Sequence, residues 1–276
     1  MKDKMNRIIT AIIFVLVVIA VLMIHQPIVY TLLVLVISLL GIHEYNNAFR
    51  AKGYHPIPWL GYLSCFGIFL AEDYIDLDLK ILLIQILLPA VLIISFIYMM
   101  FHKGKYTIID MTITVFSLLY IPFMFSFIKL LSMMEHGRIF VLLSLLSASI
   151  SDTCAYEIGS RFGKHKLCER ISPKKTVEGA LAGVIGVIIA YVIVAMIMEY
   201  ALAIPVNMLF MIVTAIVTSV LGQFGDLSAS LVKRYCGIKD FGTLMPGHGG
   251  ILDRCDSILF TAPAVYICIK IAMLFI

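Results

Sequence analysis

Residues 207–224, NMLFMIVTAIVTSVLGQF, form an apolar run close to the ~20 residues that a helix needs to cross a bilayer. The run leads directly into residues 226–257, DLSASLVKRYCGIKDFGTLMPGHGGILDRCDS, which carry four carboxylates and four Lys or Arg side chains. Charge beside a membrane-spanning helix is costly unless it is paired, hydrated or bound to a metal ion. We therefore expect a membrane-embedded helical protein that does chemistry in this charged segment.

The composition of the whole chain supports that fold class. Of the 276 residues, 62% are hydrophobic and 14% are charged, and a mean hydropathy of +1.04 excludes a soluble globular domain. The apolar runs do not alternate with polar residues, as the strands of an outer-membrane barrel would. We predict an all-α, polytopic integral membrane helical bundle. About nine transmembrane helices are expected, at residues 8–24, 28–42, 58–71, 81–101, 110–131, 139–151, 179–198, 207–224 and 257–276.

The distribution of Lys and Arg predicts the orientation of the chain in the cell membrane. With the N-terminus in the cytoplasm, 17 of the 21 Lys and Arg residues lie on the cytoplasmic side, as the positive-inside rule requires. An odd number of spans then places the C-terminus outside. We predict N-terminal transmembrane helices in residues 1–138. Residues 139–276 would form a C-terminal catalytic domain with two charged loops on the cytoplasmic side.

The helix of residues 207–224 is expected to continue as far as residue 234. Asp226, Ser230 and Lys233 then share one face, because they are spaced at i, i+4 and i+7. One interpretation is a lysine that extends to the membrane interface and pairs with the aspartate. The other is a polar face that takes part in a reaction.

Glycines punctuate the segment after residue 236. Residues 246–250, Pro-Gly-His-Gly-Gly, cannot form an ordinary helix. Glycines let backbone N–H groups approach an anion closely, and they also permit the positive φ angles of a re-entrant turn. The sequence leaves both interpretations open. The glycines concerned are Gly237, Gly242, Gly247, Gly249 and Gly250.

Carboxylates and basic residues flank these glycines. Asp253 and Asp256 lie at i and i+3 in the first turn of the last span, where carboxylates favour the helix dipole. Together with Asp226 they also offer the oxygen ligands that Mg²⁺ prefers, and this second interpretation predicts one or two Mg²⁺ ions. The earlier basic segment, residues 172–176, Ser-Pro-Lys-Lys-Thr, predicts either a lipid-headgroup patch or a grip on polyphosphate.

The ordered polar positions of residues 226–257 resemble a known family, the phosphatidate cytidylyltransferases, also called CDP-diacylglycerol synthases. The clear resemblance covers residues 150–257 and includes Ser172–Gly179 and Asp152-Thr153. The N-terminal spans match in hydropathy alone. The matching positions are Ser230, Lys233-Arg234, Lys239-Asp240, Pro246, His248-Gly249-Gly250, Asp253-Arg254 and Asp256-Ser257.

The resemblance implies that CTP and phosphatidic acid from the inner leaflet give CDP-diacylglycerol and pyrophosphate in phospholipid biosynthesis. It also implies Mg²⁺, a site that faces the cytoplasm and a homodimer, and we expect no nucleic-acid partner. The expected catalytic residues are Asp226, Lys233, Asp253 and Asp256, and the expected metal ligands are Asp226, Asp253 and Asp256. The expected substrate-binding residues are Ser172, Lys174, Lys175, Ser230, Arg234, Lys239, Asp240, His248, Gly249, Gly250 and Arg254.

Two other functions are compatible with so apolar a chain. A transporter with a charged gate at the membrane midplane predicts charges spread through several spans, whereas these charges gather in two loops. A CTP-dependent lipid or polyprenol kinase would use the same kinds of residue, but it would release CDP in place of pyrophosphate. The fate of the phosphates of CTP therefore separates the candidate enzymes.

Overall fold

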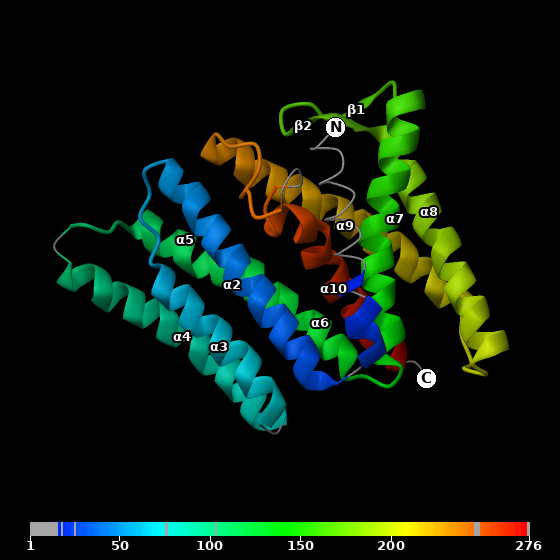
Figure 1. Ribbon diagram of the computed structural model, residues 1–276, viewed down its shortest axis with the longest axis horizontal. Coiled ribbons are helices and arrows are strands. Elements are labelled where there is room, and N and C mark those ends of the chain that lie inside the picture. Colours follow the sequence, from blue (N-terminus) through cyan, green and yellow to red (C-terminus); the bar gives the residue numbers. More distant parts are fainter. Residues whose placement is uncertain are drawn as a thin grey trace. The chain divides into compact units, whose positions relative to one another are not determined.

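A computed structural model describes residues 16–17, 19–24, 26–74, 77–102, 104–245 and 249–274. Within these residues the regular secondary structure is helical apart from one short hairpin (Figure 1). Its elements are α2 (Pro27–Ala51), α3 (Pro58–Tyr74), α4 (Leu77–Phe101), α5 (Ile108–Leu118), the π-helical turn η1 (Leu119–Phe123), α6 (Met124–Ser132), α7 (Gly137–Phe162), β1 (Lys166–Cys168), β2 (Ser172–Thr176), α8 (Val177–Met196), η2 (Ile197–Ala201), α9 (Met208–Cys236) and α10 (Leu252–Met273).

The helices confirm the predicted class, a helical polytopic membrane protein. Among the described residues, six helices or continuous helical runs are long and apolar enough to cross a membrane. Two shorter apolar helical stretches, Pro58–Phe69 and Ile86–Phe101, lie in α3 and α4. Each predicted span after the first coincides with one of these segments. The first, 8–24, lies mostly outside the described residues, so the count of nine stays a prediction.

Contacts between residues divide the chain into two compact units. Unit 1 comprises Met1–Met133 and Lys233–Cys255, and unit 2 comprises Met134–Val232 and Asp256–Ile276. The predicted division into residues 1–138 and 139–276 stays a prediction; the contacts of residues 233–255 group them with the N-terminal helices. The segment that carries the glycine-rich loop is therefore held by helices outside the clear family resemblance.

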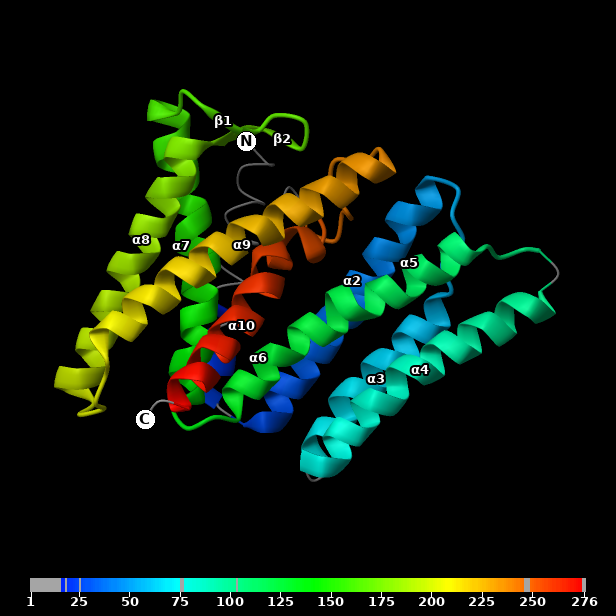
Figure 2. The same ribbon diagram turned by 180° about the vertical axis from the view of Figure 1, so that it is seen from behind.

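Unit 1 is built around α2, which packs against α3, α5 and α6. Helices α3 and α4 run side by side, as Figure 2 shows. Large side chains of α2, α3 and α6, among them Tyr30, Tyr45, Phe69 and Phe125, are almost completely buried. Between α5 and α6 the helix widens into η1 around Pro122, because proline lacks the N–H that a regular α-helix needs.

Unit 2 is built around α7 and α8, which lie side by side along their length (Figure 1). Small residues let their backbones approach closely. A Cβ placed on Gly186 of α8 would lie 2.6 Å from Sγ of Cys154 on α7, and one on Gly183 would lie 2.9 Å from Oγ of Ser151. Helices that associate within a membrane commonly use small residues in this way.

Hydrogen bonds between buried side chains link the helices of unit 2. On α7, the Ser147 hydroxyl pairs with Tyr191 of α8 at 2.8 Å and donates to Thr218 of α9 at 3.0 Å. One turn further along α7, Ser151 pairs with Ser219 at 3.1 Å. These bonds are directional, so they fix how α7 is rotated about its axis, and with it the residue that follows Ser151, Asp152.

Candidate functional site

Polar groups of side chains and backbone gather in each unit, and the first set lies at the end of α9 and in the loop that follows it. We call Lys233, Phe241, Gly250 and Asp253 the loop cluster, which lies in unit 1. Nζ of Lys233 lies 2.7 Å from Oδ1 of Asp253, and Oδ2 of Asp253 accepts hydrogen bonds from N–H of Phe241 at 2.7 Å and of Gly250 at 2.9 Å. The Lys233 and Asp253 side chains are 11% and 4% exposed. Asp253 therefore holds the two ends of the loop together while it pairs with a buried cation.

Glycines make this loop geometry possible. Gly237, which ends α9, and Gly249 have φ angles of 72° and 85°, a region that residues with a side chain seldom adopt. A Cβ on Gly249 would also lie 2.8 Å from Oδ2 of Asp253. Gly249 has the positive φ angle that one of the two interpretations of these glycines requires. The predicted site residue His248 lies outside the described residues, as do Pro246 and Gly247.

The loop makes one further contact that the sequence analysis missed. The carboxylate of Glu44, on α2, accepts hydrogen bonds from N–H of Ile251 and Leu252, each at 2.9 Å. Glu44 and its partners are more than 200 positions apart, so no local pattern connects them. Glu44 lies two residues beyond the predicted span 28–42, so from the sequence it would be read as a residue of the membrane interface. The signal that could have found it is a charge next to an apolar run, since ionisable residues inside the membrane are commonly functional.

Unit 2 contains two further sets of polar side chains, Lys175 with Asp226 and Ser257 with Asp152 and Asp256, which we together call the helix cluster. The ammonium of Lys175 on β2 forms an ion pair with Oδ2 of Asp226 on α9. Oγ of Ser257 donates to Oδ2 of Asp152 at 3.2 Å, and N–H of Ser257 donates to Oδ1 of Asp256 at 2.8 Å. Side chains of α7, β2, α9 and α10 thus contribute three carboxylates and an ammonium to unit 2.

Close helix packing positions Asp226 in this cluster. Gly225, the residue before it, faces α10 so closely that a Cβ would lie 2.7 Å from the carbonyl oxygen of Asp256 and 3.2 Å from Cα of Ser257. The predicted continuation of the helix through residue 234 is confirmed, because α9 extends to Cys236. Oγ of Ser230 donates to Oδ1 of Asp226 at 3.4 Å, as their shared face predicted. Lys233, which shares that predicted face, pairs instead with Asp253.

The hairpin of β1 and β2 positions the side chain of Lys175. The sequence analysis did not predict strands here, but Lys166 pairs with Thr176 and Cys168 with Ser172 in an antiparallel arrangement. Oγ1 of Thr176 caps α8 by accepting from N–H of Gly179 at 3.2 Å. Thr176 is therefore fixed at the end of β2, and Lys175 beside it is directed to Asp226.

Glu178 fastens the other end of the hairpin. Its carboxylate accepts hydrogen bonds from N–H of Lys164 at 3.1 Å and of His165 at 3.2 Å, and lies 2.6 Å from Nδ1 of His165. The segment from Ser172 to Gly179 therefore holds the hairpin in place as well as providing basic side chains.

The remaining predicted substrate-binding residues are mostly at the surface. Nη1 of Arg234 donates to the carbonyl oxygen of Ile238 at 3.3 Å. Ser172 lies half-buried in β2. The exposed residues are Lys174, Arg234, Lys239, Asp240 and Arg254.

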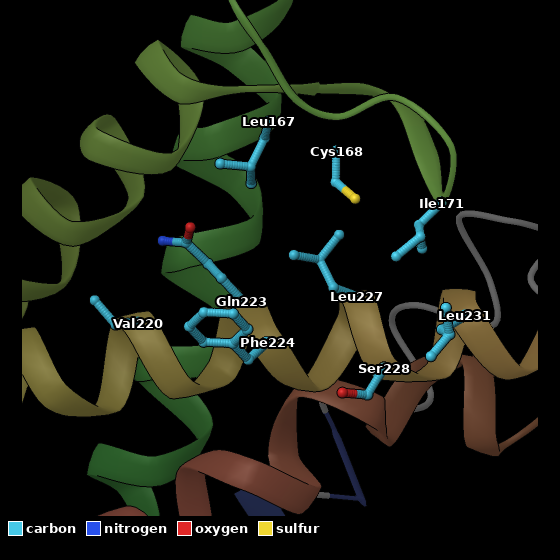
Figure 3. Close-up of a pocket in the computed structure, with 9 residues that line it drawn as sticks. All are labelled: Leu167, Cys168, Ile171, Val220, Gln223, Phe224, Leu227, Ser228 and Leu231. Carbon is cyan, nitrogen blue, oxygen red and sulfur yellow. The ribbon is translucent and has the colours of Figure 1, made fainter.

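An apolar cavity of about 500 Å³ opens between the hairpin and α9, within unit 2. Figure 3 shows Cys168 and Ile171 of the hairpin directed toward the α9 face that carries Leu227. This face is distinct from the one that carries Asp226. The cavity is lined by Leu167, Cys168, Ile171, Val220, Gln223, Phe224, Leu227, Ser228 and Leu231.

The donor chemistry for a metal ion is present as carboxylates. Among the residues that the structure describes, no three His, Cys, Asp or Glu side chains lie close enough together to hold a metal ion. Asp226 and Asp253 are each paired with a lysine. Carboxylate oxygens are nevertheless the ligands that Mg²⁺ prefers. In this structure a lysine ammonium is the cation beside Asp226 and beside Asp253. The Mg²⁺ ligands stay a prediction.

Comparison with known proteins gives one consistent result. The model of a cytidylyltransferase family matches residues 5–272. A phosphatidate cytidylyltransferase of Staphylococcus haemolyticus (strain JCSC1435) is 35% identical over 186 residues, which cover 66% of this chain and 69% of that protein. One of Bacillus subtilis (strain 168) is 33% identical over 204 residues, which cover 74% of this chain and 71% of that protein. Because the family model matches nearly the whole chain, the chain belongs to the cytidylyltransferase family.

Proposed function

We propose that the protein transfers the cytidylyl group of CTP to phosphatidic acid, which yields CDP-diacylglycerol and pyrophosphate. The observation that carries this proposal is the family match over residues 5–272, together with relatives whose name is phosphatidate cytidylyltransferase. The clusters of carboxylates and lysines supply groups suited to such a reaction. A membrane-embedded enzyme also meets its lipid substrate directly in the bilayer.

The chemistry asks the protein mainly for charge neutralisation and alignment. A phosphate oxygen of phosphatidic acid attacks the α-phosphorus of CTP, and the bond between that phosphorus and the bridging oxygen to the β-phosphate breaks. The phosphate nucleophile is already an anion at neutral pH, so no activated serine or cysteine is needed. The obstacle is repulsion between two polyanions, and fixed positive charge lowers that barrier.

The basic residues of the two loops are the proposed phosphate ligands. Lys175 and Lys233 are the strongest candidates, because each already lies against a carboxylate in a partly or largely buried position. Arg234 offers a planar fork suited to phosphate oxygens. Lys174, Lys239 and Arg254 are exposed and would extend the positive surface that attracts the nucleotide.

The carboxylates proposed to hold Mg²⁺ are Asp226 and Asp256 in unit 2 and Asp253 in unit 1. Bound Mg²⁺ would supply positive charge to the phosphates and to the leaving pyrophosphate. The lysines that now pair with Asp226 and Asp253 would turn toward phosphate when substrate binds. Of the three carboxylates, Asp226 and Asp253 would thus each bring a lysine to the bound phosphates.

The apolar cavity between the hairpin and α9 is the proposed site for an acyl chain of phosphatidic acid. Its lining is largely hydrocarbon, with Gln223 and Ser228 as the polar exceptions. Apolar pockets with few polar groups are typical of sites for hydrophobic ligands. Leu227 follows Asp226 on α9 but lies on a different face, so the headgroup of a lipid held there would have to reach around α9 to the helix cluster.

We also propose the orientation and assembly that the sequence implies. The N-terminus lies in the cytoplasm and the C-terminus outside, because 17 of 21 Lys and Arg residues then face the cytoplasm. CTP is cytosolic, so the site opens to that side and takes phosphatidic acid from the inner leaflet. The family resemblance supports a homodimer in the cell membrane.

Radiolabelled CTP provides the decisive test of the reaction. Purified protein is incubated with phosphatidic acid, Mg²⁺ and CTP that carries the label at either the α- or the γ-phosphate. Cytidylyl transfer moves the α-label into the lipid fraction and releases the γ-label as pyrophosphate. Entry of the γ-label into lipid identifies a kinase. Failure of both labels to reach lipid overturns the proposal and favours a transporter.

A further inference from the structure

Glu44 is the one carboxylate of α2, and it is directed into unit 1. The side chain is 6% exposed, although α2 is apolar and long enough to cross a membrane. A buried charge is costly unless it is hydrogen-bonded or paired. Its two oxygens are satisfied by N–H of Ile251 and Leu252, which lie at the start of α10.

These two hydrogen bonds serve an otherwise unsatisfied helix end. The first N–H groups of a helix have no partner within it, and the N-terminus carries partial positive charge. Most helices supply a cap from an adjacent residue. At α10 the cap comes from another helix, so α2 determines where α10 begins. Asp253 lies in the first turn of α10.

The loop also closes around the Glu44 carboxylate. A Cβ on Gly242 would lie 2.6 Å from Oε1 of Glu44, and one on Gly250 would lie 2.3 Å from Oε2. Both positions therefore require glycine while Glu44 is in place. The neighbouring N–H groups, of Phe241 and Gly250, donate to Asp253. Two carboxylates thus hold the same loop, Glu44 at residues 251–252 and Asp253 at residues 241 and 250.

We infer that Glu44 is a positioning residue that sets the loop and the Asp253 carboxylate in their working arrangement. Glu44 acts through Ile251 and Leu252 and does not touch the substrates. Without it, the start of α10 loses its cap, and the orientation of Asp253 relative to Lys233 is no longer fixed. The catalytic part of the inference rests on the proposed function, whereas the effect on the loop does not.

The first test is Glu44→Gln, measured by hydrogen–deuterium exchange of the whole protein in detergent without substrate. Glutamine keeps the size of the side chain, but its amide nitrogen cannot accept a hydrogen bond, so one of the two N–H groups loses its partner. We expect faster exchange in peptides that cover residues 249–254. The hairpin residues 166–176 should keep the exchange rate of the unsubstituted protein. Unchanged exchange at 249–254 overturns the inference.

Asp110→Asn is the matched control. Asp110 is also a buried carboxylate of unit 1, 1% exposed, and accepts from N–H of His55 and of Thr107, which belong to the connection before α3 and to the N-cap of α5 and not to the loop. This variant should leave exchange at residues 249–254 unchanged. If both variants accelerate it equally, the effect is general loosening of unit 1, and the inference fails.

Kinetics supply the second readout. Partners that orient a metal-binding or catalytic carboxylate typically contribute 10–100-fold, so we expect Glu44→Gln to lower kcat by about that factor. The KM for phosphatidic acid should not change, since Glu44 does not contact the lipid. Glu44→Asp keeps the charge, should give an intermediate kcat, and replaces Glu44→Gln if that variant does not fold. A kcat unchanged in both variants contradicts the positioning role. Absence of α-label transfer by the unsubstituted protein would contradict the proposed function alone, because the exchange experiment would still decide the role of Glu44.

Discussion

The ammonium of Lys175, next to the end of strand β2, forms an ion pair with the carboxylate of Asp226 on helix α9. The two side chains are 23% and 26% exposed, so water reaches the pair. Ion pairs of this kind contribute at most about 1 kcal/mol to folding. Substrate phosphates can therefore separate Lys175 from Asp226 at little cost, and the pair is suited to function more than to stability.

Asp226→Asn should abolish most of the turnover while the protein still inserts and folds. We expect a loss on the order of 100-fold or more in transfer of α-label to lipid, since groups that stabilise the transferred charge contribute that much. The melting temperature should change little, because the Lys175–Asp226 pair is hydrated. Near-normal activity at saturating Mg²⁺ would contradict the role of Asp226.

Lys233→Met should reduce stability as well as activity. Removal of one member of a buried ion pair leaves the other without its counter-charge, which costs about 3–5 kcal/mol. Asp253 is the residue left behind. The double variant Lys233→Met with Asp253→Asn should recover part of that loss. Lys174→Met, at an exposed position of β2, is the control and should keep the melting temperature of the unsubstituted protein. Equal melting temperatures for Lys233→Met and Lys174→Met would contradict the prediction.

Arg234→Lys should raise the KM for CTP. Lysine keeps the charge but lacks the planar fork that contacts two phosphate oxygens at once. One hydrogen bond to a charged group contributes about 1.5–3 kcal/mol, which corresponds to an increase of roughly tenfold or more. Arg161→Lys is the control, because Arg161 is exposed and pairs with Glu157 on the same helix. If kcat and the KM for CTP are both unchanged in Arg234→Lys, the phosphate assignment is wrong.

Val220→Trp should impair the use of long-chain phosphatidic acid. The indole would fill part of the cavity between the hairpin and α9, and we expect a higher KM for long-chain lipid than for a short-chain analogue. Val213→Trp makes the same change two turns earlier on α9, at a site of similar exposure that does not line the cavity. The same chain-length profile in both variants would argue against an acyl site here.

Single cysteines at positions 174 and 239, in a chain whose six native cysteines are replaced, test the orientation. Both positions should react with a membrane-impermeant thiol reagent from the cytoplasmic side, and CTP should slow the reaction. Inverted and right-side-out vesicles compare the two faces directly. Reaction from the outside would reverse the predicted topology.

Hydropathy predicted the membrane helices because a segment that crosses a bilayer must pair its own backbone N–H and C=O groups, as a helix does, and must present apolar side chains to lipid. The continuation of α9 beyond residue 224 also followed from the sequence, since Asp226 and Ser230 share a face and now share a hydrogen bond. Both properties are local. They depend on residues within a few turns of one another, which is the range over which a sequence pattern carries information.

Long-range contacts escaped the sequence analysis. Lys175 and Glu44 lie far along the chain from Asp226 and Leu252, and no periodicity connects them. The hairpin escaped as well, because β1 has three residues and β2 contains a proline and two lysines, a composition that does not favour strands. The pairing of β1 with β2 is supported by contacts outside the strands: Glu178 accepts hydrogen bonds from N–H of Lys164 and His165, and Thr176 caps α8.

The contact between Cys154 and Gly186 has a practical consequence for chemical inactivation. A methyl carbon on Gly186 would lie 2.6 Å from the thiol sulfur, so in its present orientation an alkylated Cys154 side chain would press on α8. Asp152 is two residues away on α7 and would move with the helix. If a maleimide inactivates the enzyme through Cys154, we expect the cause to be displacement of α7 relative to α8 and not modification of a catalytic thiol. Cys154→Ala should then be active and resistant to the reagent.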